Sequence, residues 1–222
     1  MSIRKSVVSG SFYPNDKEEL LKYINQLNFK SDSELFENIK EIKDVKAIIV
    51  PHAGYIYSAY TANLAYNYCR NINPKRLIVI GPSHQTYLKG ASVALYDEYE
   101  TPLGNLKIDK IFSEELINKY SFLDFNTECE FEHSTEIQMP FIKYYFDNAS
   151  IVEIIYGEID FNYLSELIDD LLKNSDNFIV ISTDLSHFYT LEEANNLDIN
   201  CINAIKEKDL ELLDYGEACG KI

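Results

Sequence analysis

Three short runs of apolar, mostly β-branched residues share one design along the chain. They lie within residues 46–50, 76–80 and 177–181, without polar alternation, and a Pro, Gly or Ser follows each run at once. Uninterrupted runs of this length predict strands buried on both faces, and the breakers predict where the strands end. A fourth run, 150–156, ends at Gly157 and is less purely apolar. Together these runs predict the strands of one sheet.

Helical patterns separate the predicted strands. Apolar residues recur at helix-like spacing in 58–69, 161–172 and 191–205, and Asn15 offers an N-cap to a helix whose first turn is acidic. Strands that alternate with amphipathic helices predict an α/β domain around a central parallel or mixed sheet. Residues 91–108 fall outside this alternation and predict strand and hairpin structure. The chain carries no internal repeat and no Pro/Gly-rich linker, so we expect one domain over 1–222.

Three of the four histidines follow a predicted strand by two to six residues: His52, His84 and His187. In open α/β sheets ligands bind at the carboxyl ends of the strands. If the three strands are neighbours, these histidines meet in one cleft. Imidazole is the commonest protein ligand for zinc, copper and iron and the usual acid or base near neutral pH. Taken singly, each histidine is equally compatible with a loop or core residue whose hydrogen bonds are satisfied.

The fourth histidine, His133, precedes a helix start. Ser134 or Thr135 is expected to cap that helix, with Gln138 reaching back. His133 then either supports the site or contacts a substrate, or it is a solvated residue at the helix start. Asp184, next to the third strand, either orients an imidazole, ligates a metal or closes a turn.

Other catalytic signatures are missing from the sequence. It has no G-x-S-x-G, P-loop, G-x-G-x-x-G or C-x-x-C motif, so metal chemistry at the histidines is the best fit. Three of the four cysteines, Cys69, Cys129 and Cys201, are expected to be small buried apolar residues.

Charge and hydropathy exclude some partners. The chain has 222 residues, 20 of them basic and 36 acidic, and a net charge of −16. That excess argues against nucleic acids and anionic membranes as partners. No apolar run approaches the ~20 residues of a membrane span, and the N-terminus lacks the apolar core of a signal peptide, so we expect a cytoplasmic protein.

Six motifs give the chain a resemblance to the Memo family. In chain order they are G-S-F-Y-P at 10–14, P-H-A-G-Y-I-Y-S at 51–58, G-P-S-H at 81–84, T-P-L-G at 101–104, E-H-S-T-E-I-Q-M-P-F at 132–141 and S-T-D-L-S-H at 182–187. Prokaryotic members of this family are called AmmeMemoRadiSam system protein B. The resemblance implies a fold like that of the class III extradiol ring-cleavage dioxygenases.

The resemblance also implies site residues. In the dioxygenases two histidines and a glutamate hold iron, and the Memo family resembles that site with a cysteine in place of the glutamate. The metal ligands are then His52, His84 and Cys219, and the metal is iron or copper, with zinc also compatible. His187 takes the acid/base position, and Asp184 and His133 match positions near the site. Family members usually continue for several dozen residues past this cysteine, so we expect the usual C-terminal elements to be missing after Ile222.

Three functions remain open at this point. The first is a metal-dependent, dioxygenase-like oxidoreductase. The second is a non-enzymatic module whose vestigial cleft binds a peptide or protein. The family name implies radical-SAM and AMMECR-type protein partners for it, and the acidic chain favours a protein over a phosphopeptide. The third, a metal-dependent hydrolase, needs Asp184 or Glu136 to activate water.

Overall fold

The computed structural model describes residues 1–34 and 44–221, and its centre is a six-stranded mixed sheet. The strand order is β2-β9-β3-β8-β4-β7. β4 runs antiparallel to β8, and the other neighbours are parallel. The strands are β2 (Ala47–Val50), β3 (Arg76–Pro82), β4 (Ala91–Val93), β7 (Leu123–Asp124), β8 (Ser150–Tyr156) and β9 (Asn177–Ser182). The predicted α/β class with a mixed sheet is confirmed, and the strands of the three histidine-bearing runs are neighbours.

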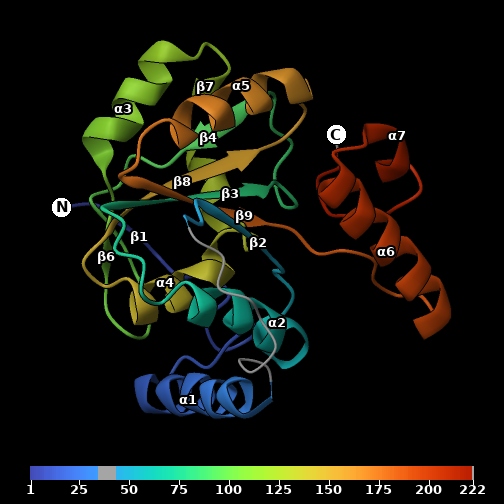
Figure 1. Ribbon diagram of the computed structural model, residues 1–222. Helices are drawn as coiled ribbons and strands as arrows, with labels where there is room; N and C mark the ends of the chain where they lie inside the picture. Colours follow the sequence, from blue (N-terminus) through green and yellow to red (C-terminus); the bar gives the residue numbers. More distant parts are fainter. Residues whose placement is uncertain (35–43, 222) are drawn as a thin grey trace.

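Helices cover both faces of this sheet, as Figure 1 shows. On one face lie α2 (Tyr55–Tyr68) and α4 (Met139–Tyr145), with α1 (Lys17–Glu34) outside α2; on the other lie α3 (Lys110–Lys119) and α5 (Phe161–Leu172). Successive strand residues serve opposite faces, because side chains alternate along a strand. In β3, Val79 joins the apolar cluster under α2, while Ile78 and Ile80 join the cluster under α5.

A smaller sheet lies beside the first. Its order is β1-β5-β6, from β1 (Ile3–Arg4), β5 (Glu98–Tyr99) and β6 (Leu106–Lys107). β5 and β6 form an antiparallel hairpin, which confirms the strand and hairpin structure predicted for 91–108. Two short 3₁₀ helices, η1 (Thr127–Phe131) and η2 (Glu136–Gln138), precede α4.

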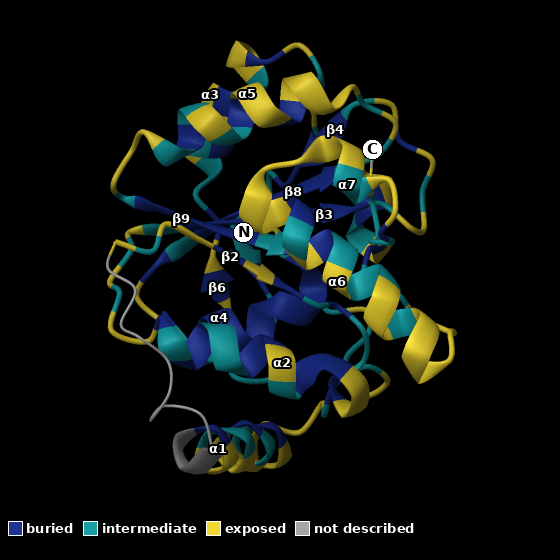
Figure 2. Ribbon diagram, turned by 45° about the vertical axis from the view of Figure 1, so that its right-hand side comes forward, coloured by how far each residue is buried: buried dark blue, intermediate teal, exposed yellow. Residues whose placement is uncertain are grey.

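The C-terminal helices stand apart from this layered body. α6 (Leu191–Glu207) packs on α7 (Leu210–Leu213), and Figure 1 shows the pair at one side of the molecule. In Figure 2 most of α6 is coloured as intermediate or exposed. Within the described residues, neither main apolar cluster contains a residue of α6 or α7. None of the helices described is long and apolar enough to cross a membrane.

Two local predictions are wrong. β2 is not buried on both faces, because it is an edge strand: Ile48 and Val50 pack under α2, but Ile49 is 48% exposed on the other face. The first helix is capped by Asp16 rather than Asn15, since Asp16 Oδ1 accepts the N–H groups of residues 18 and 19.

Other predictions are confirmed. The helix expected at 161–172 has those bounds, and Cys69, Cys129 and Cys201 are buried. The expectation about elements after Ile222 lies outside the described residues.

Candidate metal centre

Three candidate residues occupy the same place relative to their strands. His52 lies two residues past β2, His84 two past β3 and Asp184 two past β9. These strands are parallel neighbours, so their carboxyl ends meet at one edge of the sheet. The topology therefore brings the three side chains to one place.

His133 joins them from the segment before α4. This segment approaches the end of β3 so closely that a Cβ at Gly81 would lie 2.8 Å from Ser134 Oγ, so only glycine fits there. The ring centroids are 5.2 Å apart for His52 and His84, 5.7 Å for His52 and His133, and 4.8 Å for His84 and His133. One ring nitrogen from each of the three lies within 4.8 Å of the other two.

The hydrogen bonds of Ser182 decide which nitrogen of His52 faces the centre. Ser182 Oγ donates to the carbonyl oxygen of Ser134 at 2.5 Å and accepts from Gln138 Nε2 at 2.9 Å. Its remaining lone pair accepts the Nδ1–H of His52 at 3.2 Å. The lone pair of His52 is therefore on Nε2.

That Nε2 atom is buried and lacks a hydrogen-bond partner among the described residues. His52 is only 1% exposed, and burial lowers its pKa to about 4, although the Asp184 carboxylate opposes the shift. The imidazole is thus neutral at physiological pH, with an unused lone pair on Nε2. Because a buried polar atom without a partner costs free energy, this is the arrangement expected of a metal ligand.

A buried carboxylate, Glu132, holds the other two imidazoles. Its Oε1 lies 3.1 Å from His84 Nδ1 and 3.2 Å from His133 Nδ1. Its Oε2 accepts the backbone N–H groups of His84 at 2.5 Å and Gln85 at 3.1 Å. Both rings therefore keep Nδ1–H toward Glu132 and a lone pair on Nε2.

The negative charge on the Glu132 carboxylate is stabilised by its hydrogen bonds. Burial alone would raise the pKa of this carboxyl, but the imidazole and backbone hydrogen bonds outweigh burial and hold the pKa well below its usual range. In turn, the hydrogen bond to Glu132 raises the pKa of His84. Glu132 is a residue that sequence reasoning missed as a site residue; the only signal was its place in the motif that contains His133.

Asp184 binds the backbone of the His52 loop as Glu132 binds that of the His84 loop. Its Oδ1 accepts the N–H groups of His52 at 2.6 Å and Ala53 at 3.1 Å. Its Oδ2 lies 3.9 Å from His52 Nε2. The backbone at each of the three clustered histidines is thus fixed by a carboxylate that accepts two successive N–H groups.

The C-terminal segment brings Cys219 to the opposite side of His52. The backbone N–H of Cys219 donates to the Asp184 carbonyl at 2.8 Å, and Thr183 Oγ1 donates to the Cys219 carbonyl at 2.9 Å. Ligand atoms of Cys219, Asp184 and His52 lie within 4.8 Å of one another. Burial raises the pKa of the Cys219 thiol. Among the described residues, no such group contains both Cys219 and His84.

His187 lies apart from both groups. It is exposed, its Nδ1 is 3.0 Å from the Leu185 carbonyl oxygen, and its ring packs on Phe188. Neither ligand group in the described part of the chain includes it. Its acid/base role stays a prediction.

The capping predicted next to His133 is wrong, because those side chains bond to the sheet. Ser134 Oγ donates to the Pro82 carbonyl, Thr135 Oγ1 to Glu153 and Gln138 Nε2 to the Pro51 carbonyl. Neither of the two short helices that follow has a side-chain cap. These bonds hold the His133 segment against the ends of β2 and β3 and the middle of β8.

A buried arginine supports the same segment from the small sheet. Arg4 is fully buried, and its Nη2 donates to the backbone carbonyl of Glu132 at 3.0 Å. Its guanidinium also lies 3.5 Å from Glu136 and 3.9 Å from Glu153. The N-terminal strand β1 therefore fixes the chain at the residue that holds two of the histidines.

Comparison with known proteins agrees with the motifs. A family model described as Memo-like protein matches residues 4–216. A protein of Aquifex aeolicus, named as a MEMO1 family protein, is 36% identical over 220 residues, covering 97% of this chain and 79% of that protein. One of Methanobrevibacter smithii with the same name is also 36% identical, over 93% of this chain and 77% of that protein.

Proposed function

The chain belongs to the Memo family, and from that premise we propose that it binds a transition-metal ion at the carboxyl edge of its main sheet. The observation that carries the proposal is the buried Nε2 of His52, which has a lone pair and no hydrogen-bond partner among the described residues. A ring nitrogen of His52 lies within 4.8 Å of one from His84 and one from His133. An apolar or purely structural role for His52 would leave that nitrogen uncompensated.

The donor atoms indicate which metals fit. His52, His84 and His133 offer imidazole nitrogens, and Cys219 and Asp184, which form a second group with His52, offer sulfur and carboxylate oxygen. Nitrogen and sulfur donors suit iron, copper and zinc, whereas magnesium and calcium need oxygen ligands. A bound iron or copper ion would supply redox chemistry, and zinc would supply a Lewis acid.

The protein's own groups would then set the ligands and handle protons. Glu132 and Ser182 hold the Nδ1–H groups, so that each Nε2 stays available to the metal. Asp184 Oδ2 lies 3.9 Å from His52 Nε2, where it would accept or return a proton beside the metal. We propose a dioxygenase-like redox role, in which His187 takes part only if its exposed loop approaches the centre.

A second candidate function is a binding module for a protein partner. Exposed apolar side chains favour it: Ile56 and Tyr57 follow the His52 loop, and Phe188 follows His187. Apolar residues gathered at a functional edge mark interaction sites. Radical-SAM and AMMECR-type proteins are the partners proposed under this second function.

Elemental analysis tests the first function. Protein purified without chelator, or reconstituted with Fe(II), Cu or Zn, should hold close to one ion per chain. His52→Ala should abolish binding, and His84→Ala and His133→Ala should weaken it by about 10–100-fold. His187→Ala is the matched control and should bind like the wild type.

Absence of metal from the reconstituted wild type would overturn the metal proposal. Retention of a radical-SAM or AMMECR-type protein on the immobilised chain would then support the binding module, while a clean pull-down would remove that function as well.

A further inference from the structure

A groove of about 330 Å³ opens directly beside His84. One wall is the loop of 83–88, and Gly157 and Glu158 close the groove at the end of β8. Its volume is at the lower end of the range for pockets that take small organic ligands. One end of any molecule in this groove would face the histidine centre.

The walls of the groove are fixed by backbone contacts. Glu158 N–H donates to the Leu88 carbonyl at 2.7 Å, and Gly157 N–H donates to the Gly90 carbonyl at 3.0 Å. A Cβ at Gly157 would lie 2.1 Å from the Leu88 carbonyl oxygen, so only glycine allows this approach. The groove is therefore already formed without a ligand.

The polar groups in the groove favour a cation. The Tyr87 ring is 77% exposed, and its hydroxyl donates to the Glu158 carboxylate. Within the described residues the groove is lined by no Lys or Arg, and Glu158 forms no ion pair. A carboxylate without an ion pair, next to an exposed aromatic side chain, favours an ammonium group and repels anions.

We propose that this groove binds a small organic cation, a primary amine with a short apolar body whose other end reaches the metal-binding histidines. The ammonium group lies between the Tyr87 ring and the Glu158 carboxylate. The inference rests on the proposed function for the identity of the centre, but Tyr87 and Glu158, which bind the ammonium group, belong to neither group of candidate metal ligands.

Phenethylamine is a suitable probe, because 2-phenylethanol and phenylacetate differ from it chiefly in charge. Dissociation constants would be measured by NMR titration of the metal-free protein and of the zinc-loaded protein. We expect the amine to bind about tenfold more tightly than the alcohol and phenylacetate to bind less tightly than either. Glu158→Gln and Tyr87→Leu should each weaken amine binding about three- to fivefold, and Tyr87→Phe, which keeps the ring, by less than twofold.

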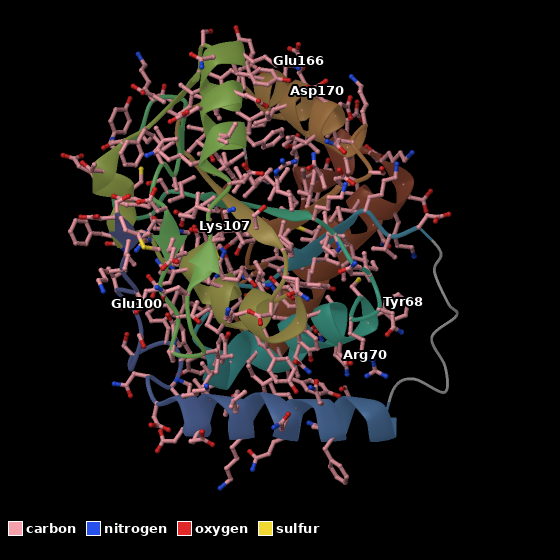
Figure 3. The ribbon with its side chains drawn as sticks, turned by 90° about the vertical axis from the view of Figure 1, so that its left-hand side faces the viewer. Tyr68, Arg70, Glu100, Lys107, Glu166 and Asp170 are labelled. Atoms are coloured by element: carbon pink, nitrogen blue, oxygen red, sulfur yellow. The ribbon has the colours of Figure 1, made fainter. Side chains whose placement is uncertain are left out.

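A matched variant controls for the protein's overall negative charge. Asp170 on α5 also accepts a tyrosine hydroxyl, that of Tyr120 at 3.0 Å, and Figure 3 shows it at the top of the molecule. Asp170→Asn removes the same charge and should leave amine binding unchanged. Equal affinity for amine and alcohol, or equal losses in Glu158→Gln and Asp170→Asn, would overturn the proposal.

The metal titration separates this inference from the proposed function. If the protein holds no metal but binds the amine through Glu158, the groove stands and the metal centre fails. If the protein holds metal and shows no preference for the amine, the metal centre stands and the proposal for the groove fails.

Discussion

The two sides of the histidine centre are built differently. On one side, the buried Glu132 carboxylate accepts hydrogen bonds from the rings of His84 and His133. The buried Arg4 donates to the backbone carbonyl of Glu132. On the other side, Cys219 is held through its backbone by Asp184 and Thr183 and belongs to the segment after α7. His52 belongs to both groups of ligand atoms.

The difference is one of preorganisation. Glu132 fixes the tautomer and position of two rings before any metal arrives, so little conformational freedom is lost on binding. At Cys219, hydrogen bonds within the described residues hold only the backbone. The helices that precede it, α6 and α7, contribute no residue to either main apolar cluster of the described chain. We infer that the histidine side provides most of the affinity and that the cysteine side adjusts the properties of the bound ion.

Removing the Glu132 carboxylate should give the largest effect. Glu132→Ala leaves the backbone N–H groups of His84, Gln85 and Ser134 without their acceptor. We expect a loss of about 3–5 kcal/mol in the free energy of unfolding and weaker metal binding by at least tenfold. Chemical denaturation measures the free energy of unfolding, and metal titration measures the affinity. Glu128→Ala, an exposed neighbour, is the control, and similar losses in both variants would contradict the comparison.

Acid should weaken the folded state through His52. Its pKa of about 4 is lower than the ordinary 6.5, so the unfolded chain takes up this proton first as pH falls. The stabilisation is therefore complete above pH 6.5 and is lost as pH falls toward 4, by about 3 kcal/mol in metal-free protein. Denaturation curves of wild type and His52→Gln at several pH values give the difference. His187→Gln should keep the wild-type slope; a His52→Gln slope equal to wild type would refute this account.

Removing the Asp184 carboxylate should reduce stability and metal affinity by an intermediate amount. Asp184→Ala removes the acceptor for the N–H groups of His52 and Ala53. We expect a loss of about 2 kcal/mol in unfolding free energy and roughly tenfold weaker metal binding. Asp184→Asn keeps an oxygen acceptor and should lose about half as much stability. A larger effect than that of Glu132→Ala would reverse the order of the two sides.

The smallest effect is expected at Cys219. Cys219→Ala should change the free energy of unfolding by about 0.5 kcal/mol or less, because the variant keeps the backbone groups of residue 219 that bond to Asp184 and Thr183. Cobalt-substituted protein should keep its ion but lose the thiolate-to-metal charge-transfer absorption. Complete loss of the ion from Cys219→Ala would show that the cysteine side provides the affinity.

The sheet and its histidine loops follow from local patterns, and the support around them does not. An apolar run ending in Gly81 or Pro51 signals a strand and its carboxyl end without any knowledge of partners. Glu132 gives no such signal, because its partners His84 and Gln85 are 48 and 47 residues away and no periodicity connects them. The exposure of Ile49 was missed for a similar reason: an edge strand and a central strand have the same local composition.

Local capping rules failed where tertiary contacts competed. Ser134 and Thr135 are good capping residues, but they bond to Pro82 and Glu153, which only the folded chain supplies. His187 was placed near His52 by its position after a strand and Cys219 by resemblance, and within the described residues only Cys219 shares a ligand group with His52.

The strand order has a consequence for the sequence of events during synthesis. Among the described strands β2 has one neighbour, β9, which is inserted between β2 and β3 although it is made more than a hundred residues after β3 begins. Until 177–184 has left the ribosome, the His52 loop has neither its strand partner nor the carboxylate that fixes its backbone. Such long-range pairing forms late in folding. A nascent chain therefore cannot bring the candidate ligands together until β9 and the residues that follow it have been synthesised.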